Sequence, residues 1–387
     1  MRGIADALHY DPATMPATSH PDLTTARRLP KVLLHEHLDG GLRVATLLAL
    51  LRQRRLAAPA DTEAALGAWF EARAHAGSLG EYLRGFGLTV AAMATPRALE
   101  QVAFEAAEDA ALDGCVLAEF RIAPLLFEPF GVTGEAAVEA MIDGLARAQE
   151  SIGIPCGLIV CAMRHHPAEA IARSAALALR YRQAGDLRDD VADGNGATGG
   201  LPRPGVIAFD LAGPEAGYPA TAHADLLQRV LDGGMSLTLH AGEADAGHRV
   251  LEAARLGARR IGHGVRLVDL LHLPKGDDLL AELHERGVHL EICPTSNVHT
   301  GAAASLATHP IRALARAGVS LSFHTDNRLM SCTTMSAEAQ GLVERAGFTW
   351  PELQRMGLAA AEASFLPAAA RAQARAALQA WGDGTTV

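Results

Sequence analysis

Two histidines, His35 and His37, stand one residue apart at the end of the apolar segment PKVLLHEHLDGG. Side chains of a strand alternate between its two faces, so both imidazoles are expected on one face and Glu36 on the other. Imidazole nitrogens are common ligands of zinc. The segment therefore predicts a buried strand that ends at a candidate metal site.

Three further polar residues end apolar segments: His240 in LHAGE, His263 in GHG and Asp326 in HTD. Each one alone is more typical of a core or surface group than of a ligand. Together with His35 and His37 they supply the nitrogen and oxygen donors that zinc prefers. Without a metal, each of these buried polar groups would need a separate partner, because unpaired ones are costly.

Eight apolar segments are expected to be strands, and each precedes an alanine- and leucine-rich stretch of helical period. They are 31–37, 116–124, 155–163, 205–213, 235–243, 260–267, 288–296 and 319–327. Eight such units favour an α/β fold with a (β/α)8 TIM-like barrel, whose strand ends meet at one face. An open doubly wound sheet is the alternative, but no G-x-G-x-x-G follows the first strand.

Extra segments interrupt the even spacing. About eighty residues between the first two strands predict additional helices. Among them, SLGEYLRGF places Leu79, Tyr82, Leu83 and Phe86 at helical spacing, which is typical of a stripe that packs on the core.

Three other segments set the domain organisation. Residues 1–29 are expected to form a loose N-terminal arm, and 30–387 a single domain. The stretch 185–205 is rich in Gly, Asp and Pro and predicts a surface loop. Residues 334–382 have a helical composition and are expected to pack outside the barrel.

Composition narrows the classes of partner. A net charge of −10 and a pI near 5.9 disfavour nucleic acid as a partner. Five cysteines without C-x-x-C spacing favour neither a disulfide framework nor a cysteine zinc site, and they indicate a reducing cytoplasm. We find no secretory signal or apolar run of spanning length, so a membrane is not an expected partner.

Six motifs occur in a fixed order: LHEHLDG, DLAG, LHAGE, IGHG, CPTSN and HTDN. This order resembles the adenosine deaminase family of the amidohydrolase superfamily, from Pro30 to the AAEASFL segment at 360–366. The resemblance implies hydrolysis of adenosine or 2′-deoxyadenosine to inosine or 2′-deoxyinosine and ammonia. The expected partner is thus a small aminopurine nucleoside.

The resemblance also implies the metal ligands. One zinc ion per chain is expected on His35, His37, His240 and Asp326. The fourth strand has no lysine at its end, unlike the superfamily members that bridge two metals. A mononuclear site is therefore expected.

Three residues are implied in the chemistry. His263 is expected to orient a water molecule and help to deprotonate it, while Asp326 accepts a hydrogen bond from that water. Glu243, as the protonated acid, is expected to donate to the ring nitrogen beside the carbon under attack.

Three more residues are implied in recognition. Asp39 corresponds to the residue that binds the 5′-hydroxyl, although it also suits a turn before two glycines. The backbone N–H of Gly213 is expected to face ring nitrogen 3. Asn327 replaces the commonest aspartate of the family and offers an amide donor to ring nitrogen 7.

Two polar neighbours receive other interpretations. His324 is interpreted first as a core histidine, with a role beside the ligands or as an extra ligand as alternatives. Glu36 is interpreted as a structural ion-pair partner.

Two alternative functions are weighed. The first is deamination of another 6-aminopurine compound, such as adenine, aminofutalosine or an N6-substituted adenine nucleotide. A charged 5′ substituent would need a cation, for which Arg73 and Arg84 are the candidates. The second, a catalytically silent nucleoside-binding protein, is disfavoured because Glu243 and His263 are both present.

Overall fold

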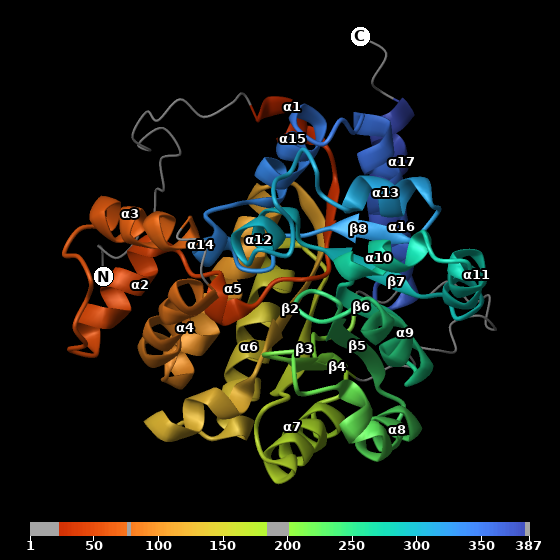
Figure 1. Cartoon of the computed structure of the whole chain (residues 1–387). Coiled ribbons are helices and arrows are strands. Elements are labelled where there is room, and N and C mark those ends of the chain that lie inside the picture. Colours follow the sequence, from red (N-terminus) through yellow and green to blue (C-terminus); the bar gives the residue numbers. More distant parts are fainter. Residues whose placement is uncertain (1–22, 76–78, 184–200, 384–387) are drawn as a thin grey trace.

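Eight parallel strands follow one another in chain order and confirm the predicted barrel (Figure 1). The computed structural model describes residues 23–75, 79–183 and 201–383. The strands are β1 (Lys31–Leu33), β2 (Cys115–Ile122), β3 (Cys156–Met163), β4 (Val206–Ala212), β5 (Ser236–Ala241), β6 (Arg260–His263), β7 (His289–Ile292) and β8 (Leu321–Phe323). Each falls within or next to a segment predicted from its apolar run.

The barrel closes between the ends of β8 and β1. The backbone N–H of His37 donates to the carbonyl of Asp326 at 2.8 Å, and the N–H of Asp326 donates to the carbonyl of His35 at 3.0 Å. The chain beyond β1 is therefore bonded directly to the chain beyond β8. This closure brings residues that are far apart in the sequence into contact.

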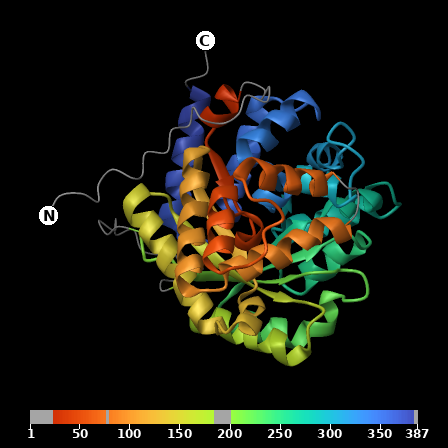
Figure 2. The same ribbon diagram turned by 90° about the vertical axis from the view of Figure 1, so that its left-hand side faces the viewer.

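Four helices fill the long excursion after β1, as predicted, and lie together on one side of the barrel (Figures 1 and 2). They are α2 (Val44–Gln53), α3 (Glu63–Ala74), α4 (Leu79–Met93) and α5 (Pro96–Leu112). The Thr62 and Thr95 side chains accept hydrogen bonds from the first turns of α3 and α5, which is why these helices begin there. Phe86 of α4 packs against the main core, while the side chains of 79–84 lie outside the described residues.

The remaining helices surround the strands. Those before the C-terminal segment are α6 (Gly134–Ile152), α7 (Ala168–Arg180), α8 (Ala224–Asp232), α9 (His248–Arg255), α10 (Val268–Leu271), α11 (Gly276–Glu285), α12 (Pro294–His299), α13 (Ile311–Arg316) and α14 (Arg328–Ser331). Most follow a strand directly, as the alternating βα pattern requires.

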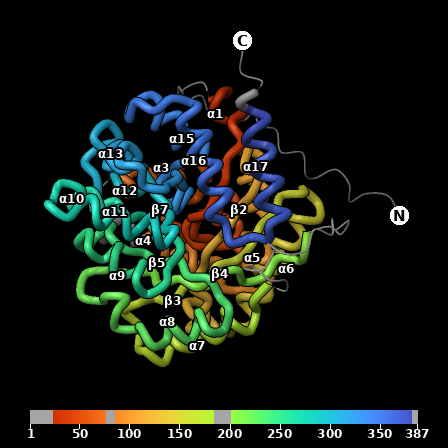
Figure 3. Tube along the Cα trace, turned by 90° about the vertical axis from the view of Figure 1, so that its right-hand side faces the viewer, coloured from red at the N-terminus to blue at the C-terminus, as the bar shows by residue number. Residues whose placement is uncertain are grey.

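The C-terminal segment is helical, as predicted, with α15 (Met335–Glu344), α16 (Trp350–Ala363) and α17 (Ala368–Asp383). Helices α16 and α17 lie side by side against the outside of the barrel (Figure 3). Val32 of β1, Leu34 just after it and Leu117 of β2 pack there against Ala360 and Leu378. Burial of this apolar surface attaches the tail to the barrel.

Two predicted segments fall largely outside the described residues. Of the N-terminal arm, 1–22 are outside, whereas α1 (Thr24–Arg28) is helical with Ala26 and Leu29 buried. Of the predicted surface loop at 185–205, residues 185–200 lie outside the described residues. Across the helices that are described, none combines the length and the hydrophobicity that a bilayer crossing requires.

Candidate metal centre and active site

Buried side chains gather at the point where the barrel closes. Ligand atoms of His35, His240, His263 and Asp326 all lie within 4.8 Å of one another. His37 lies beside them, with its Nε2 3.3 Å from Nε2 of His240 and 3.6 Å from Oδ1 of Asp326. The structure thus brings all five predicted residues together, and distance alone admits either His37 or His263 as the fourth ligand.

Carboxylates orient two of the imidazole rings. Nδ1 of His35 lies 2.8 Å from Glu291, and Nδ1 of His240 lies 2.9 Å from Asp210. These contacts occupy the outer nitrogen of each ring. Nε2 of His35 is buried and has no hydrogen-bond partner among the described residues. An unpartnered nitrogen on a ring that a carboxylate holds from behind fits a metal ion at the centre of the group.

One guanidinium joins the two orienting carboxylates. Arg121, fully buried on β2, donates to Asp210 at 2.9 Å and to Glu291 at 2.6 Å. Burial would raise the pKa of Glu291, but the charges of Arg121 and Arg260 hold it well below its usual range. Burial would likewise raise the pKa of Asp210, but His240 and Arg121 lower it, so both carboxylates are ionised and suited to accept from the ring N–H groups.

The protonation states of His35, His37 and Asp326 also suit a cation. Burial lowers the pKa of His35 and places that of His37 well below its ordinary value, so both rings are neutral. Burial opposes charge on His240 as well, but the adjacent Asp210 carboxylate raises its pKa. For Asp326, burial is outweighed by the contact with His35, whose Nε2 lies 3.3 Å from Oδ1, and by the other nearby imidazoles, so its pKa lies well below the usual range.

The backbone conformation of two of these residues directs their side chains into the site. His263 and Asp326 have positive φ angles of 62° and 60°, a region that residues with a side chain seldom adopt. Gly262 precedes His263, and a Cβ there would lie 2.9 Å from Cε1 of His35. A glycine at this position leaves room for the His35 ring.

Glu243 lies on the loop after β5, at the same end of the barrel. Its Oε1 accepts from Thr300 at 2.8 Å, and its Oε2 lies 3.5 Å from Nε2 of His263. The loop is held by the buried Glu215, which accepts from the backbone N–H groups of Gly242, Glu243 and Asp245. The predicted acid and the predicted base therefore face each other.

The predicted recognition residues lie at the same opening. Asp39 is buried in the 3₁₀ turn Leu38–Gly40, and burial raises its pKa to about 7. Oδ1 of Asp39 and Oδ1 of Asn327 are both buried without a hydrogen-bond partner among the described residues. A Cβ on Gly40 would lie 2.0 Å from Oδ1 of Asn327, so Gly40 is needed for the two segments to approach. Gly213 turns the chain after β4 with φ of 91°.

His324 and Glu36, the two polar neighbours of the site, each have defined contacts. His324 is fully buried, accepts from the backbone N–H of Leu34 at 3.1 Å and contacts Ser322 at 2.7 Å. Both of its ring nitrogens are satisfied, which confirms the core interpretation. Glu36 accepts from Arg328 at 2.5 Å and from Thr325 at 2.8 Å, which confirms the structural ion pair.

Sequence reasoning missed the residues that support the site. Arg121, Asp210 and Glu291 are charged residues inside otherwise apolar strands, and that anomaly is a signal that could have identified them. Glu215 gave no such signal, because it sits in a loop where an acid is ordinary.

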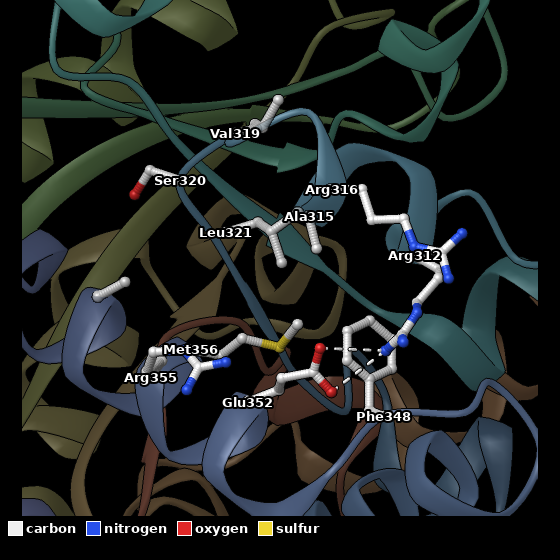
Figure 4. A pocket seen from close by; sticks show the side chains of 11 residues that line it. Arg312, Ala315, Arg316, Val319, Ser320, Leu321, Phe348, Glu352, Arg355 and Met356 are labelled. Atoms are coloured by element: carbon white, nitrogen blue, oxygen red, sulfur yellow. Dashed lines mark hydrogen bonds and ion pairs between the residues drawn. The ribbon is translucent and has the colours of Figure 1, made fainter.

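A separate cavity of about 260 Å³ lies between α13, the start of β8 and α16 (Figure 4). Arg312 stacks over Phe348 there and pairs with Glu352 at 3.3 Å. The cavity includes Ser320 and Leu321, at the opposite end of β8 from Asp326. None of the predicted site residues lines it.

Comparisons with known proteins agree with this geometry. A family model described as adenosine deaminase matches residues 30–193 and 200–381. An adenosine deaminase from Mycobacterium marinum is 42% identical over 362 residues, covering 90% of this chain and 94% of that protein.

Solved structures show the same fold. Adenine deaminase from Arthrobacter aurescens superposes with a TM-score of 0.77 at 23% identity, over 92% of this chain and 99% of that one. An amidohydrolase from Burkholderia ambifaria, solved with bound zinc, has a TM-score of 0.74 at 22% identity, over 96% of each chain.

Proposed function

The chain belongs to the adenosine deaminase family, and we propose how this hydrolase uses its site to convert adenosine to inosine and ammonia. 2′-Deoxyadenosine would give 2′-deoxyinosine by the same route. The observation that carries the proposal is the buried group of His35, His240, His263 and Asp326 at the same barrel end as Glu243. A binding protein would need no such pairing of a metal centre with an acid.

We assign one zinc ion to the ligands His35, His37, His240 and Asp326. The neutral state of His35 and His37 and the low pKa of Asp326 support this set. A bound zinc ion lowers the pKa of water, so that hydroxide is available near neutral pH. His263 is assigned to proton handling, because its Nε2 faces the Glu243 carboxyl group and its Nδ1 lies against the Asn297 amide.

The protein side chains divide the remaining work. His263 orients the attacking water and takes up its proton, and Asp326 accepts a hydrogen bond from the same water. Glu243 in its protonated form donates to ring nitrogen 1 as the carbon beside it is attacked. Charge on the ring is thereby neutralised while the tetrahedral intermediate forms.

Recognition is assigned to three positions. Asp39 accepts from the 5′-hydroxyl, and its unpartnered Oδ1 supports a contact to the ligand. Asn327 donates to ring nitrogen 7, and the backbone N–H of Gly213 donates to ring nitrogen 3. These contacts describe a purine nucleoside bound across the mouth of the barrel.

The charges near Asp39 favour a nucleoside over a nucleotide. Arg43 forms ion pairs with Glu108 and Asp109, and Arg328 forms ion pairs with Glu36 and Asp109.

Arg73 and Arg84 are the two cations considered for a 5′-phosphate. Arg73 stacks 3.5 Å from the ring centre of Trp69, and the Arg84 side chain lies outside the described residues. Arg43, Arg73 and Arg328 therefore already interact with other groups of the protein.

A substrate panel tests this assignment. The zinc-replete protein is assayed for ammonia release from adenosine, 2′-deoxyadenosine, adenine and N6-methyl-AMP under identical conditions. We expect kcat/KM to be highest for the two nucleosides, by at least about 100-fold over adenine, which lacks the sugar contact. Preference for the free base or the nucleotide would overturn the substrate assignment.

We place the reaction in a reducing cytoplasm, which suits the five free cysteines.

A further inference from the structure

Helix α12 carries the CPTSN motif, to which the proposed mechanism assigns no role. The Ser296 hydroxyl donates to Oδ2 of Asp326 at 2.6 Å, and Nδ2 of Asn297 lies 3.0 Å from Nδ1 of His263. Both contacts are buried. One short helix thus reaches two groups of the metal centre.

The Asn297 amide also reaches the acid. Its Nδ2 lies 3.4 Å from Oε1 of Glu243, while Oε2 of Glu243 lies 3.5 Å from Nε2 of His263. The three side chains form a closed triangle, and Asn297 is fully buried at one corner. The residue proposed to take up a proton and the residue proposed to give one are therefore held by a single amide.

The backbone of Asn297 is fixed from several directions. Its N–H donates to the carbonyl of Cys293 at 2.8 Å, and its carbonyl accepts from Ala303 at 2.8 Å. The N–H of Thr295 donates to the buried Glu338 at 3.2 Å. A side chain on so constrained a segment can hold its partners within the narrow geometry that catalysis needs.

The chemistry of an amide suits this position. A base at Nε2 of His263 needs a free lone pair there, and hence a proton on Nδ1. A half-turn of the Asn297 amide presents Oδ1, which is otherwise buried without a partner among the described residues, to that N–H. In that orientation the protonated Glu243 can donate to the same Oδ1, so the amide keeps both contacts for either tautomer of His263 without adding a charge beside Glu243.

We propose that Asn297 is a positioning residue whose amide holds the His263 ring and the Glu243 carboxyl group in one fixed arrangement. The acceptor and the donor of protons then act on the same substrate molecule. The inference rests on the proposed function, from which it takes the roles of His263 and Glu243. Asn297 itself touches neither the substrate nor the metal in this account.

Asn297→Ala tests the proposal, with Thr300→Val as the matched control, since Thr300 donates to Glu243 but not to His263. We measure kcat and KM for adenosine, the inhibition constant of inosine, zinc content and melting temperature. Asn297→Ala is expected to lower kcat by about 100-fold, as a misplaced catalytic group does. KM and the inosine constant should change by less than about threefold, and Thr300→Val should lower kcat by less than about tenfold.

A double-mutant cycle separates positioning from general damage. Added to Glu243→Gln, the Asn297→Ala change should cost much less than it does alone, because one of its two partners is already disabled. Asn297→Asp keeps the size and an acceptor for Nδ1–H, and should recover part of the lost kcat if the alanine variant folds poorly.

Three outcomes would overturn the inference: a kcat of Asn297→Ala within about threefold of wild type, a fully additive double mutant, or a loss of kcat that merely follows loss of zinc. Wild-type protein is the reference in each case. If wild type itself does not deaminate adenosine, the proposed function fails, and this failure is distinct from a failure of the Asn297 role.

Discussion

The Nε2 atoms of His37 and His240 lie 3.3 Å apart at the mouth of the barrel. Two ring nitrogens at this separation repel unless a proton or a cation lies between their lone pairs. Because burial keeps His37 neutral, one of its ring nitrogens carries no proton, and its Nε2 can offer a lone pair to the cation that we assign to this site.

Metal removal should therefore abolish activity. Dialysis against a chelator is expected to lower kcat by more than about 100-fold, and one equivalent of zinc should restore it. The melting temperature should rise with zinc, since a ligand that binds only the folded state stabilises it. Full activity in protein shown by elemental analysis to be metal-free would contradict the assigned centre.

A methyl group at Gly262 should disturb the ligands. Gly262→Ala places a Cβ 2.9 Å from Cε1 of His35 and 3.3 Å from Cγ of His240. Weaker zinc binding and a loss of kcat of about 100-fold are expected from the displaced rings. Gly67→Ala is the control, because a Cβ at Gly67 meets no atom within 4 Å. If both variants bound zinc like wild type, the rings would be less constrained than the structure indicates.

The buried Glu338 should make stability depend on pH. Burial raises its pKa to about 7 from 4.5, so the folded state holds a proton that the unfolded state releases first. The contribution of Glu338 to the free energy of unfolding is greatest below pH 4.5. It decreases as the pH rises towards 7 and is constant above pH 7. At about 1.4 kcal/mol per pKa unit, the loss amounts to about 3 kcal/mol.

Glu338→Gln removes this titration and keeps the contacts to Thr295 and Thr333. The melting temperature of the variant relative to wild type should therefore increase between pH 5 and pH 8. Chemical denaturation at both pH values gives the same comparison as free energies of unfolding. A constant difference across this range would show that Glu338 is ionised in the folded protein.

Asn327→Asp should change the pH dependence of activity. An amide donates to ring nitrogen 7 at any pH, whereas a carboxyl group there must keep its proton to donate. We expect the variant to remain active near neutral pH and to lose kcat/KM more steeply at alkaline pH than wild type. Rates for adenosine between pH 6 and pH 9 provide the measurement, and identical flat profiles for both proteins would refute the assigned contact.

The apolar runs were sufficient to predict eight strands and their order, because each buried strand of a parallel barrel is a continuous hydrophobic segment. They could not predict where β1 and β8 bond to each other, since that closure depends on backbone contacts between residues almost 300 apart. The close approach of Gly40 and Asn327 could not be predicted from the apolar runs either, because it also joins residues far apart in the sequence.

The site was predictable in part. Five polar residues at strand ends were identified correctly as neighbours, because all carboxyl ends of the strands meet at one face. The role of Arg121 was not predictable, because it depends on Asp210 and Glu291 arriving on either side of one guanidinium.

The most direct test follows the absorbance of adenosine, which falls on conversion to inosine, with zinc-replete wild type and Glu243→Gln. Glutamine keeps an acceptor for Thr300 but cannot give up a carboxyl proton. The account predicts rapid loss of absorbance with wild type, and a kcat lower by about 100-fold to 10,000-fold in the variant with similar KM. Equal rates for the two proteins would contradict the acid role of Glu243, and no change with wild type would contradict adenosine deamination itself.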